Sequence, residues 1–157
     1  MTVVEKDRVL WSRVPLPDEL RAVLLIPEFT MPTKAARAVL PALVTRELAT
    51  YNIARACLLI ASLACGQLQH LRIAMQDQLH QPARQKIFPP MADIFEAALE
   101  AGALGVALSG AGSTVLALAR EREEEIAAAM VAAAERSDFR AQAALTRPSA
   151  AGVQIEF

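Results

Sequence analysis

The sequence predicts an α+β domain in which helices cover one face of a mostly antiparallel sheet. Two observations carry this prediction: short apolar runs bounded by Pro or Gly, which are typical of strands, and longer segments with apolar residues every three or four positions, which are typical of amphipathic helices. The chain has 157 residues, 54% of them hydrophobic and 4% aromatic. That length and composition favour a single domain over residues 1–157 with a sizeable core.

The first predicted strands are ended by prolines. We expect one over Arg8–Val14, before Pro15 and Pro17, and a second over the unbroken apolar run Ala22–Ile26, before Pro27. An unbroken run of this kind is typical of a strand that is covered on both faces or lies deep in a sheet. The second strand is therefore expected near the centre of the domain.

The predicted helices share an apolar stripe, and most of them end at a Pro or Gly. They run from Thr33 to Pro41, from Thr45 to Gly66, from Leu68 to Pro82, from Met91 to Gly102 and from Glu121 to Glu135. The second and third form an inserted antiparallel pair. The apolar stretch Ile53–Cys65 is shorter than the ~20 residues that cross a bilayer, so it predicts a core helix.

Two apolar runs, Leu104–Leu108 and Val115–Leu118, flank a glycine turn and predict a pair of strands. Further closing strands are expected over Arg140–Thr146 and Gly152–Phe157, on either side of Pro148. This order of strands and helices predicts a ferredoxin-like fold with a helical insertion.

Charge and cysteine content limit the partners and the cellular setting. Sixteen Lys and Arg against 17 Asp and Glu give a net charge of −1, which favours neither nucleic acid nor an anionic membrane as a partner. Cys57 and Cys65 lie eight residues apart, with neither a redox nor a metal-ligand spacing, and are expected to be buried as small apolar residues. Two cysteines and no apolar leader after Met1 predict a reduced, cytoplasmic setting.

The glycine turn is the most informative local motif. It consists of Ser109, Gly110, Ala111, Gly112 and Ser113, followed by Thr114. Glycines allow main-chain N–H groups to approach a ligand and can form an anion-binding nest. Gly and Ser also dominate ordinary tight turns, so the residues alone leave both interpretations open.

Three polar residues are candidates for binding an anionic or zwitterionic small molecule. Thr33 and Arg37, at positions i and i+4, share one face at the start of a helix, and Arg84 follows the predicted end of another. Arginine suits this role because its guanidinium holds a carboxylate by two parallel hydrogen bonds. The alternative is that these are ordinary surface residues.

No pattern of catalytic or metal-binding residues stands out. Asp77 and His80 are three apart and are expected to touch on one helix face, most simply as a structural pair. The sequence contains no Ser/His/Asp arrangement, HExxH motif, P-loop or metal-ligand cluster. We therefore assign no catalytic residue and no metal site.

Four segments together resemble the carboxyl-terminal half of bacterial homoserine kinases, in the GHMP kinase superfamily, in both order and spacing. They are PTKAARAVLP at 32–41, YNIARA at 51–56, DQLHQPAR at 77–84 and GALGVALSGAGST at 102–114. The resemblance implies that Thr33, Arg37 and Arg84 contact L-homoserine, with the arginines holding its carboxylate. It also implies that the glycine turn is the family's third motif, beside the phosphates.

The resemblance implies transfer of the γ-phosphoryl group of ATP to the hydroxyl of L-homoserine with Mg²⁺, a step in threonine biosynthesis. Ser113 stands where the family usually has proline, which is expected to loosen the turn, and Ala83 replaces a usual aromatic residue. The family's amino-terminal ATP-loop domain, with its Pro-x-x-x-Gly-Leu-Gly-Ser-Ser-Ala motif, is absent from this sequence. We therefore expect no kinase activity and no tight binding of ATP or Mg²⁺ by this chain alone.

Two other functions remain open. A related kinase acting on a different small alcohol would share the glycine turn but lack the set of Thr33, Arg37 and Arg84. A non-catalytic amino-acid-binding or interaction module of ferredoxin-like fold belongs to a different class. If the chain is half of an enzyme, its partner is either a separate amino-terminal half or a second copy.

Overall fold

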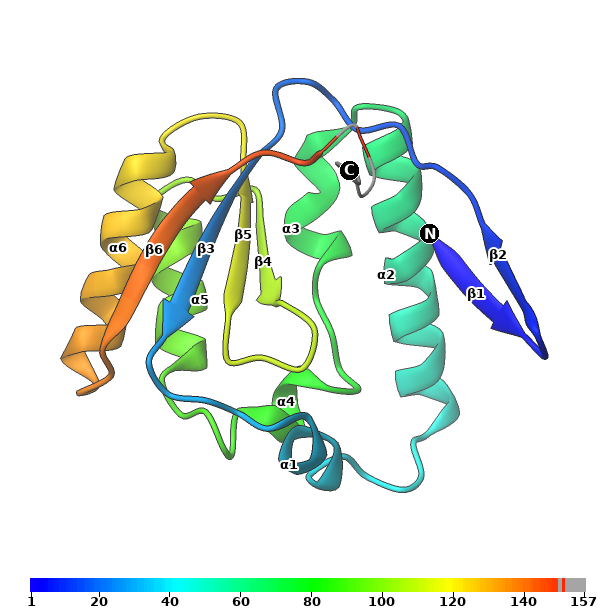
Figure 1. Ribbon diagram of the computed structural model, residues 1–157, viewed down its shortest axis with the longest axis horizontal. Coiled ribbons are helices and arrows are strands. Elements are labelled where there is room, and N and C mark those ends of the chain that lie inside the picture. The colour runs from blue at the N-terminus through cyan, green and yellow to red at the C-terminus, as the bar shows by residue number, and fades with distance from the viewer. Residues whose placement is uncertain (150, 152–157) are drawn as a thin grey trace, which may run out of the picture.

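The computed structural model describes residues 1–149 and 151, and within them the main sheet has four antiparallel strands in the order β4-β5-β3-β6 (Figure 1). The strands are β3 (Arg21–Pro27), β4 (Gly105–Leu108), β5 (Val115–Ala119) and β6 (Ala141–Thr146). Helix α5 (Met91–Glu100) precedes β4, and α6 (Glu123–Arg136) connects β5 to β6. The order β3-α5-β4-β5-α6-β6 is that of a ferredoxin-like fold, which confirms the predicted fold class.

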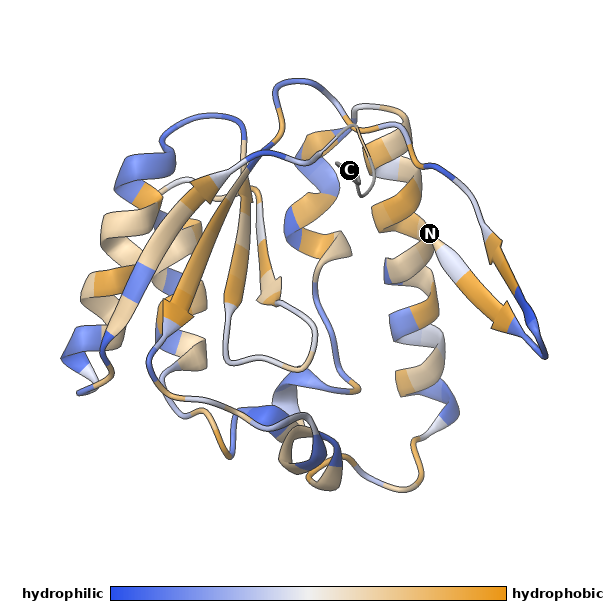
Figure 2. Cartoon of the chain, in the orientation of Figure 1, coloured by the Kyte–Doolittle hydropathy of each residue, from blue (hydrophilic) through white to orange (hydrophobic). Residues whose placement is uncertain are grey.

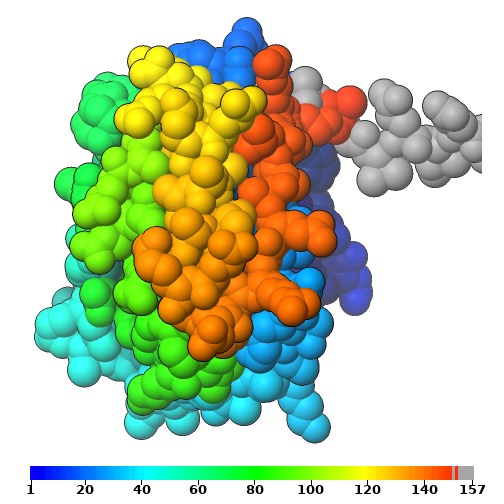
Figure 3. All heavy atoms as spheres, turned by 90° about the vertical axis from the view of Figure 1, so that its left-hand side faces the viewer, coloured from blue at the N-terminus to red at the C-terminus, as the bar shows by residue number. Residues whose placement is uncertain are grey.

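Helices α5 and α6 cover one face of this sheet. Every second residue of a strand points to the same face, so Val23 and Leu25 of β3 lie in one core with Ala117 of β5. Ile94 of α5 and Ile126 of α6 are fully buried in the same core. Figure 3 shows α6 between α5 and β6 on this side of the molecule. The predicted central strand and both predicted helices are thereby confirmed.

The inserted helices lie on the opposite face. Helix α2 (Arg46–Ala64) leads into the 3₁₀ helix η1 (Leu68–His70) and then α3 (Leu71–Ala74). Leu68 and Leu71 form a second, smaller core with Leu20, against which Leu104 and Leu118 pack. The predicted start of α2 is confirmed, because the Thr45 hydroxyl caps it by accepting the Leu48 N–H at 3.3 Å.

Helix α2 packs on the smaller core only through the partly buried Leu59 and Leu63, so the prediction of a core helix is wrong for most of its length. Ser62 is the one buried residue described in α2, and Ile53 is 64% exposed. Cys57 and Cys65 are also exposed, which corrects their expected burial. Apolar periodicity cannot tell a covered helix face from an uncovered one, because coverage depends on distant segments of chain.

None of the helices in the described part of the chain combines the length and the apolar character that crossing a membrane requires.

The predicted helix from Leu68 to Pro82 is wrong beyond Ala74. Residues 75–80 form a turn, and a new short helix, α4 (Gln81–Arg84), begins just before Pro82. Proline is accepted in the first turn of a helix because its missing N–H would have no partner there. Pro82 therefore begins a helix where the sequence interpretation took it to end one.

The amino-terminal residues form a hairpin apart from the main sheet. Strand β2 (Arg8–Trp11) ends before the predicted Val14, and it pairs with β1 (Thr2–Glu5), which the sequence interpretation missed. The predicted short helix at Thr33 is confirmed as α1 (Thr33–Ala38). The closing strand predicted over Gly152–Phe157 lies outside the described residues.

Gly105, the first residue of β4, lies so close to α3 that no side chain fits. A β-carbon there would be 2.6 Å from Met75 Sδ and 2.8 Å from the Leu71 carbonyl oxygen. We expect Gly105→Ala to lower the free energy of unfolding, measured in urea, by about 3 kcal/mol through overpacking. Gly66→Ala is the matched control, since a β-carbon there meets nothing within 4 Å and only the φ of +69° costs about 1 kcal/mol. Equal losses would contradict the close packing of α3 on β4.

Candidate functional site

The glycine turn joins β4 to β5 at one end of the sheet. It is closed by two hydrogen bonds, from the Ser109 N–H to the Thr114 carbonyl at 2.8 Å and from the Gly112 N–H to the Ser109 carbonyl at 3.0 Å. Gly110 and Gly112 have φ of +59° and +88°, which favour glycine. Within the described residues, the N–H groups of Gly110 and Ala111 donate no hydrogen bond. The turn is therefore tight and also presents two unused donors.

Contacts from the segment after β3 hold the second half of the turn. The buried Ser113 hydroxyl donates to the Phe29 carbonyl oxygen. A β-carbon at Gly112 would collide with the Met31 side chain, so the backbone approaches this segment closely. Ser113 was expected to loosen the turn, but its hydroxyl anchors the turn to Phe29, a hydrogen bond that a proline could not make.

Arg84 connects three separate segments of the chain. It is the last residue of α4, not a residue beyond a helix end as predicted, and it is 8% exposed. Its Nη1 donates to the Gly110 carbonyl at 2.9 Å, and its Nε donates to the Ala36 carbonyl of α1 at 3.5 Å. Burying a cation is costly unless its donors are satisfied, so these carbonyls stabilise the guanidinium.

The two remaining candidates lie on α1, beside α4 (Figure 1). Thr33 and Arg37 are both exposed. Neither side chain makes a hydrogen bond or ion pair with any part of the chain that the structure describes. The structure thus brings α1 against Arg84 through Ala36 and leaves the polar groups of Thr33 and Arg37 available to a ligand.

A cavity of about 300 Å³ opens beside Arg84. It is lined by Met75, Asp77, His80, Gln81, Arg84, Ala107, Leu108 and Gly110. The cavity therefore combines one wall from α4 and the turn before it with another from the end of β4 and the glycine turn.

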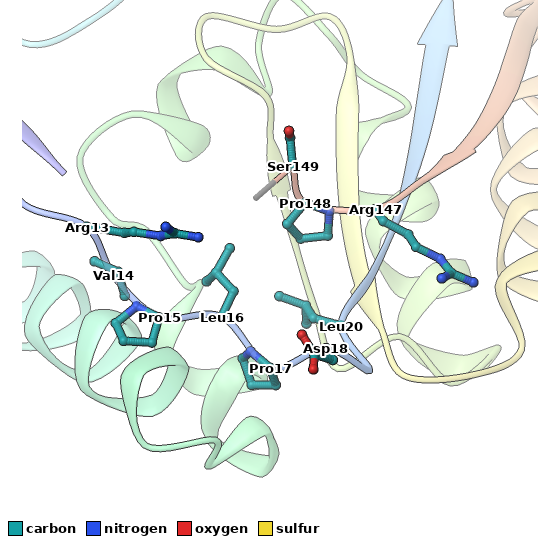
Figure 4. A pocket seen from close by; sticks show the side chains of 10 residues that line it. All are labelled: Arg13, Val14, Pro15, Leu16, Pro17, Asp18, Leu20, Arg147, Pro148 and Ser149. Atoms are coloured by element: carbon teal, nitrogen blue, oxygen red, sulfur yellow. The ribbon is translucent and has the colours of Figure 1, made fainter. Parts of the chain in front are cut away.

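A larger cavity, of about 810 Å³, lies elsewhere, between the linker after β2 and the residues after β6. Leu16 and Leu20 line it, and the guanidinium of Arg147 points away from Arg13 (Figure 4). The three candidate residues and the glycine turn do not line this cavity. Arg84 and Gly110 line the smaller cavity, which is therefore the candidate site, whereas Thr33 and Arg37 line neither cavity.

Asp77 and His80 touch as predicted, with Oδ1 and Nδ1 3.0 Å apart, but they do so in a turn and not on a helix face. Burial raises the pKa of Asp77, but hydrogen bonds from the Gln81 N–H, the His80 ring, the Asn52 amide and the His80 N–H outweigh burial and lower the pKa to about 2. Asp77 is therefore ionised at neutral pH. Among the described residues, no group of three His, Cys, Asp or Glu could hold a metal ion.

Sequence reasoning missed two residues that shape the cavity. The Gln81 Oε1 accepts the Leu108 N–H at 2.8 Å, joining α4 to the end of β4. The Asn52 amide of α2 donates to Asp77 and accepts the Gln78 N–H at 2.9 Å. Both lie in segments that carry the family resemblance, at 51–56 and 77–84, but nothing within those segments marks them, because several of their partners are backbone groups that any residue would provide.

A protein-family model, GHMP kinases C terminal, matches residues 59–136, which include α3, α4, α5, the glycine turn and α6. This chain carries a GHMP kinase C-terminal domain. Homoserine kinases are among the similar proteins: that of Moorella thermoacetica is 46% identical over 127 residues, 81% of this chain and 43% of its own. The enzyme of Persephonella marina is 34% identical over 152 residues, 97% of this chain and 51% of its own.

Solved structures agree with this assignment of the GHMP kinase domain. The crystal structure of homoserine kinase from Cytophaga hutchinsonii superposes with a TM-score of 0.82 at 29% identity, over 89% of this chain and 44% of that one. The chain thus spans about half the length of the relatives it matches. Its resemblance to the carboxyl-terminal part of homoserine kinases is confirmed.

Arg84 and Arg37 allow a matched test of buried and exposed cations. We expect Arg84→Ala to lower the free energy of unfolding by about 3 kcal/mol, because it leaves two carbonyl groups without their donor. Arg37→Ala, at an exposed position, is expected to change it by less than about 0.5 kcal/mol. Urea denaturation measures both values. If Arg84→Ala is as stable as Arg37→Ala, the hydrogen bonds of Arg84 to α1 and to the glycine turn do not stabilise the fold.

Proposed function

We propose that this chain forms the amino-acid-binding part of an ATP-dependent homoserine kinase. In the reaction, the hydroxyl oxygen of L-homoserine attacks the γ-phosphorus of ATP, ADP leaves, and the product enters threonine biosynthesis. The observation that carries the proposal is the buried Arg84 bonded to the glycine turn, in a chain whose relatives are named homoserine kinases. Phosphoryl transfer depends mainly on positioning and charge, which is what these groups can supply.

The residues take distinct roles in this proposal. Arg84 uses Nη1 and Nε within the protein, so its Nη2 remains for the homoserine carboxylate. Arg37 provides a second cation with no partner among the described residues, and Thr33 adds a hydroxyl on the same face of α1. The unused N–H groups of Gly110 and Ala111 suit a phosphate oxygen of ATP.

ATP and Mg²⁺ belong to the complete enzyme in this proposal. The chain spans about half the length of the homoserine kinases it matches, and one glycine turn offers few donors for a triphosphate. We propose that this chain alone binds neither ATP nor Mg²⁺ tightly and is inactive, and that the enzyme works in the cytoplasm.

An exposed apolar surface supports a protein partner. On the β1–β2 hairpin, Val4, Val9 and Trp11 are all exposed, with Trp11 75% exposed. Figure 2 shows hydrophobic residues on both strands of the hairpin. Surfaces of this kind mark interfaces, and an isolated hairpin is barely stable in water. We infer that the rest of a homoserine kinase covers this surface, and that the chain alone self-associates through it.

Binding of L-homoserine tests the proposed site directly. In an NMR titration, we expect saturable shifts of the Leu108 and Gly110 amide signals. Replacing Arg37 or Arg84 with Ala weakens binding about tenfold or more, through loss of charge-assisted hydrogen bonds. Arg136→Ala, on α6, serves as the control and leaves binding unchanged. A titration unaffected by both site substitutions would overturn the role of the arginines, and tighter binding of mevalonate or shikimate would favour a related kinase.

Release of ADP tests whether the chain is a complete catalyst. With ATP, Mg²⁺ and L-homoserine, we expect the chain alone to release no more ADP than a reaction without homoserine. Homoserine-dependent turnover would show that this chain builds its own nucleotide site and would refute the proposed half-enzyme.

Light scattering tests the exposed hairpin. We expect the wild-type chain to have a mass above the 16.9 kDa of a monomer and Trp11→Ser to shift it toward the monomer, since Trp11 is the most exposed aromatic side chain of the hairpin. A clean monomer for the wild-type chain would count against self-association. Phe139→Leu, in the aromatic cluster with Phe29 and Phe88, is a control away from the hairpin.

A further inference from the structure

The Asp77 carboxylate accepts hydrogen bonds from four donors just before α4. Oδ2 accepts the N–H groups of His80 at 2.7 Å and Gln81 at 2.6 Å, and Oδ1 accepts the Asn52 amide and contacts the His80 ring. A carboxylate offers about four acceptor positions, so little capacity remains for a ligand. Although Asp77 lines the cavity, its hydrogen bonds all go to other residues of the chain and fix the position of the backbone before α4.

Two of these donors are the N–H groups of His80, the residue just before α4, and of Gln81, its first residue. Helix α4 in turn carries the side chains that reach the end of β4 and the glycine turn. Gln81 and Arg84 are three residues apart, which places them on one face of α4. Gln81 accepts the Leu108 N–H, and Arg84 donates to the Gly110 carbonyl. Each residue turns a helix by about 100°, so a shift in where α4 begins would move Arg84 off the glycine turn.

Helix α2 fixes the other side of Asp77. The Asn52 amide donates to Asp77, and its oxygen accepts the next backbone N–H, that of Gln78, at 2.9 Å. The residue before Asn52, Tyr51, also contacts this turn: its hydroxyl donates to the Gln76 side chain at 2.8 Å. These contacts fasten the turn between α3 and α4 to α2, so a continuous path of hydrogen bonds runs from α2 to the glycine turn.

We propose that Asp77 is a positioning residue, which fixes the start of α4 and thereby sets Gln81 and Arg84 against the end of β4 and the glycine turn. Asn52 assists by holding Asp77 from α2. The geometry needs no ligand, so this role does not depend on what the site binds. For the proposed homoserine kinase, it explains how a buried guanidinium keeps its remaining donors directed into the cavity.

Hydrogen exchange of the Leu108 N–H, without any ligand, tests this role. The Leu108 N–H donates to Gln81 and not to Asp77. Any change in its exchange rate after substitution of Asp77 must therefore be transmitted through α4. We expect Asp77→Ala to raise its exchange rate about tenfold, the loss of roughly one hydrogen bond, and leave the central-strand amide of Val23 unchanged. Asp77→Asn, which keeps one acceptor oxygen, gives an intermediate rate, and Asp93→Ala, at an exposed site in the first turn of α5, gives the wild-type rate.

An unchanged Leu108 rate in Asp77→Ala would overturn the proposal, and so would equal increases at Leu108 and Val23, which report only global loss of stability. If Asp77→Ala does not fold, Asn52→Ala is measured instead. This variant keeps the Asp77 carboxylate but removes the hydrogen bonds that tie Asp77 and Gln78 to α2. A selective increase at Leu108 then supports the role, and its absence refutes it. Since no homoserine is present, these outcomes are distinct from success or failure of the homoserine titration.

Discussion

The buried guanidinium of Arg84 is the interaction on which the candidate site depends. It joins α4 to the backbone of α1 and to the glycine turn, three segments that are far apart in the sequence. A buried cation without partners is so unfavourable that the two carbonyl groups must stay in place around it. The same side chain therefore stabilises the local fold and brings a positive charge to the wall of the cavity.

The ferredoxin-like sheet supplies the rigid base for this arrangement. The glycine turn connects two antiparallel strands, β4 and β5, whose inner residues are packed against α5 and α6. On the other face, α3 lies close enough to Gly105 to exclude a side chain. Functional groups on loops are effective when a packed scaffold positions them, and here helices cover both faces of the two strands that the turn joins.

Groups with unused binding capacity gather around the cavity and α1. The Thr33 and Arg37 side chains and the N–H groups of Gly110 and Ala111 have no partner within the described residues, whereas Asp77 is largely satisfied and Arg84 uses its Nε and Nη1. Separately, the β1–β2 hairpin exposes several large apolar residues and α2 exposes Ile53. The chain spans about half the length of the homoserine kinases it matches, and we propose these surfaces as the places where a substrate and a protein partner bind.

The sequence by itself determined the sheet strands, the main helices, the glycine turn and the candidate residues, because each rests on local signals such as apolar spacing and Gly or Pro positions. It misplaced what depends on distant contacts: Pro82 lies in the first turn of α4, and most of the apolar stretch of α2 is only partly buried or exposed. Only the tertiary structure showed that Arg84 is buried and joins α4 to α1 and the glycine turn. It also showed that Asn52 bonds Asp77 and that Gln81 bonds the end of β4. Their partners include backbone atoms, which every residue carries, so only the folded chain decides which ones they meet.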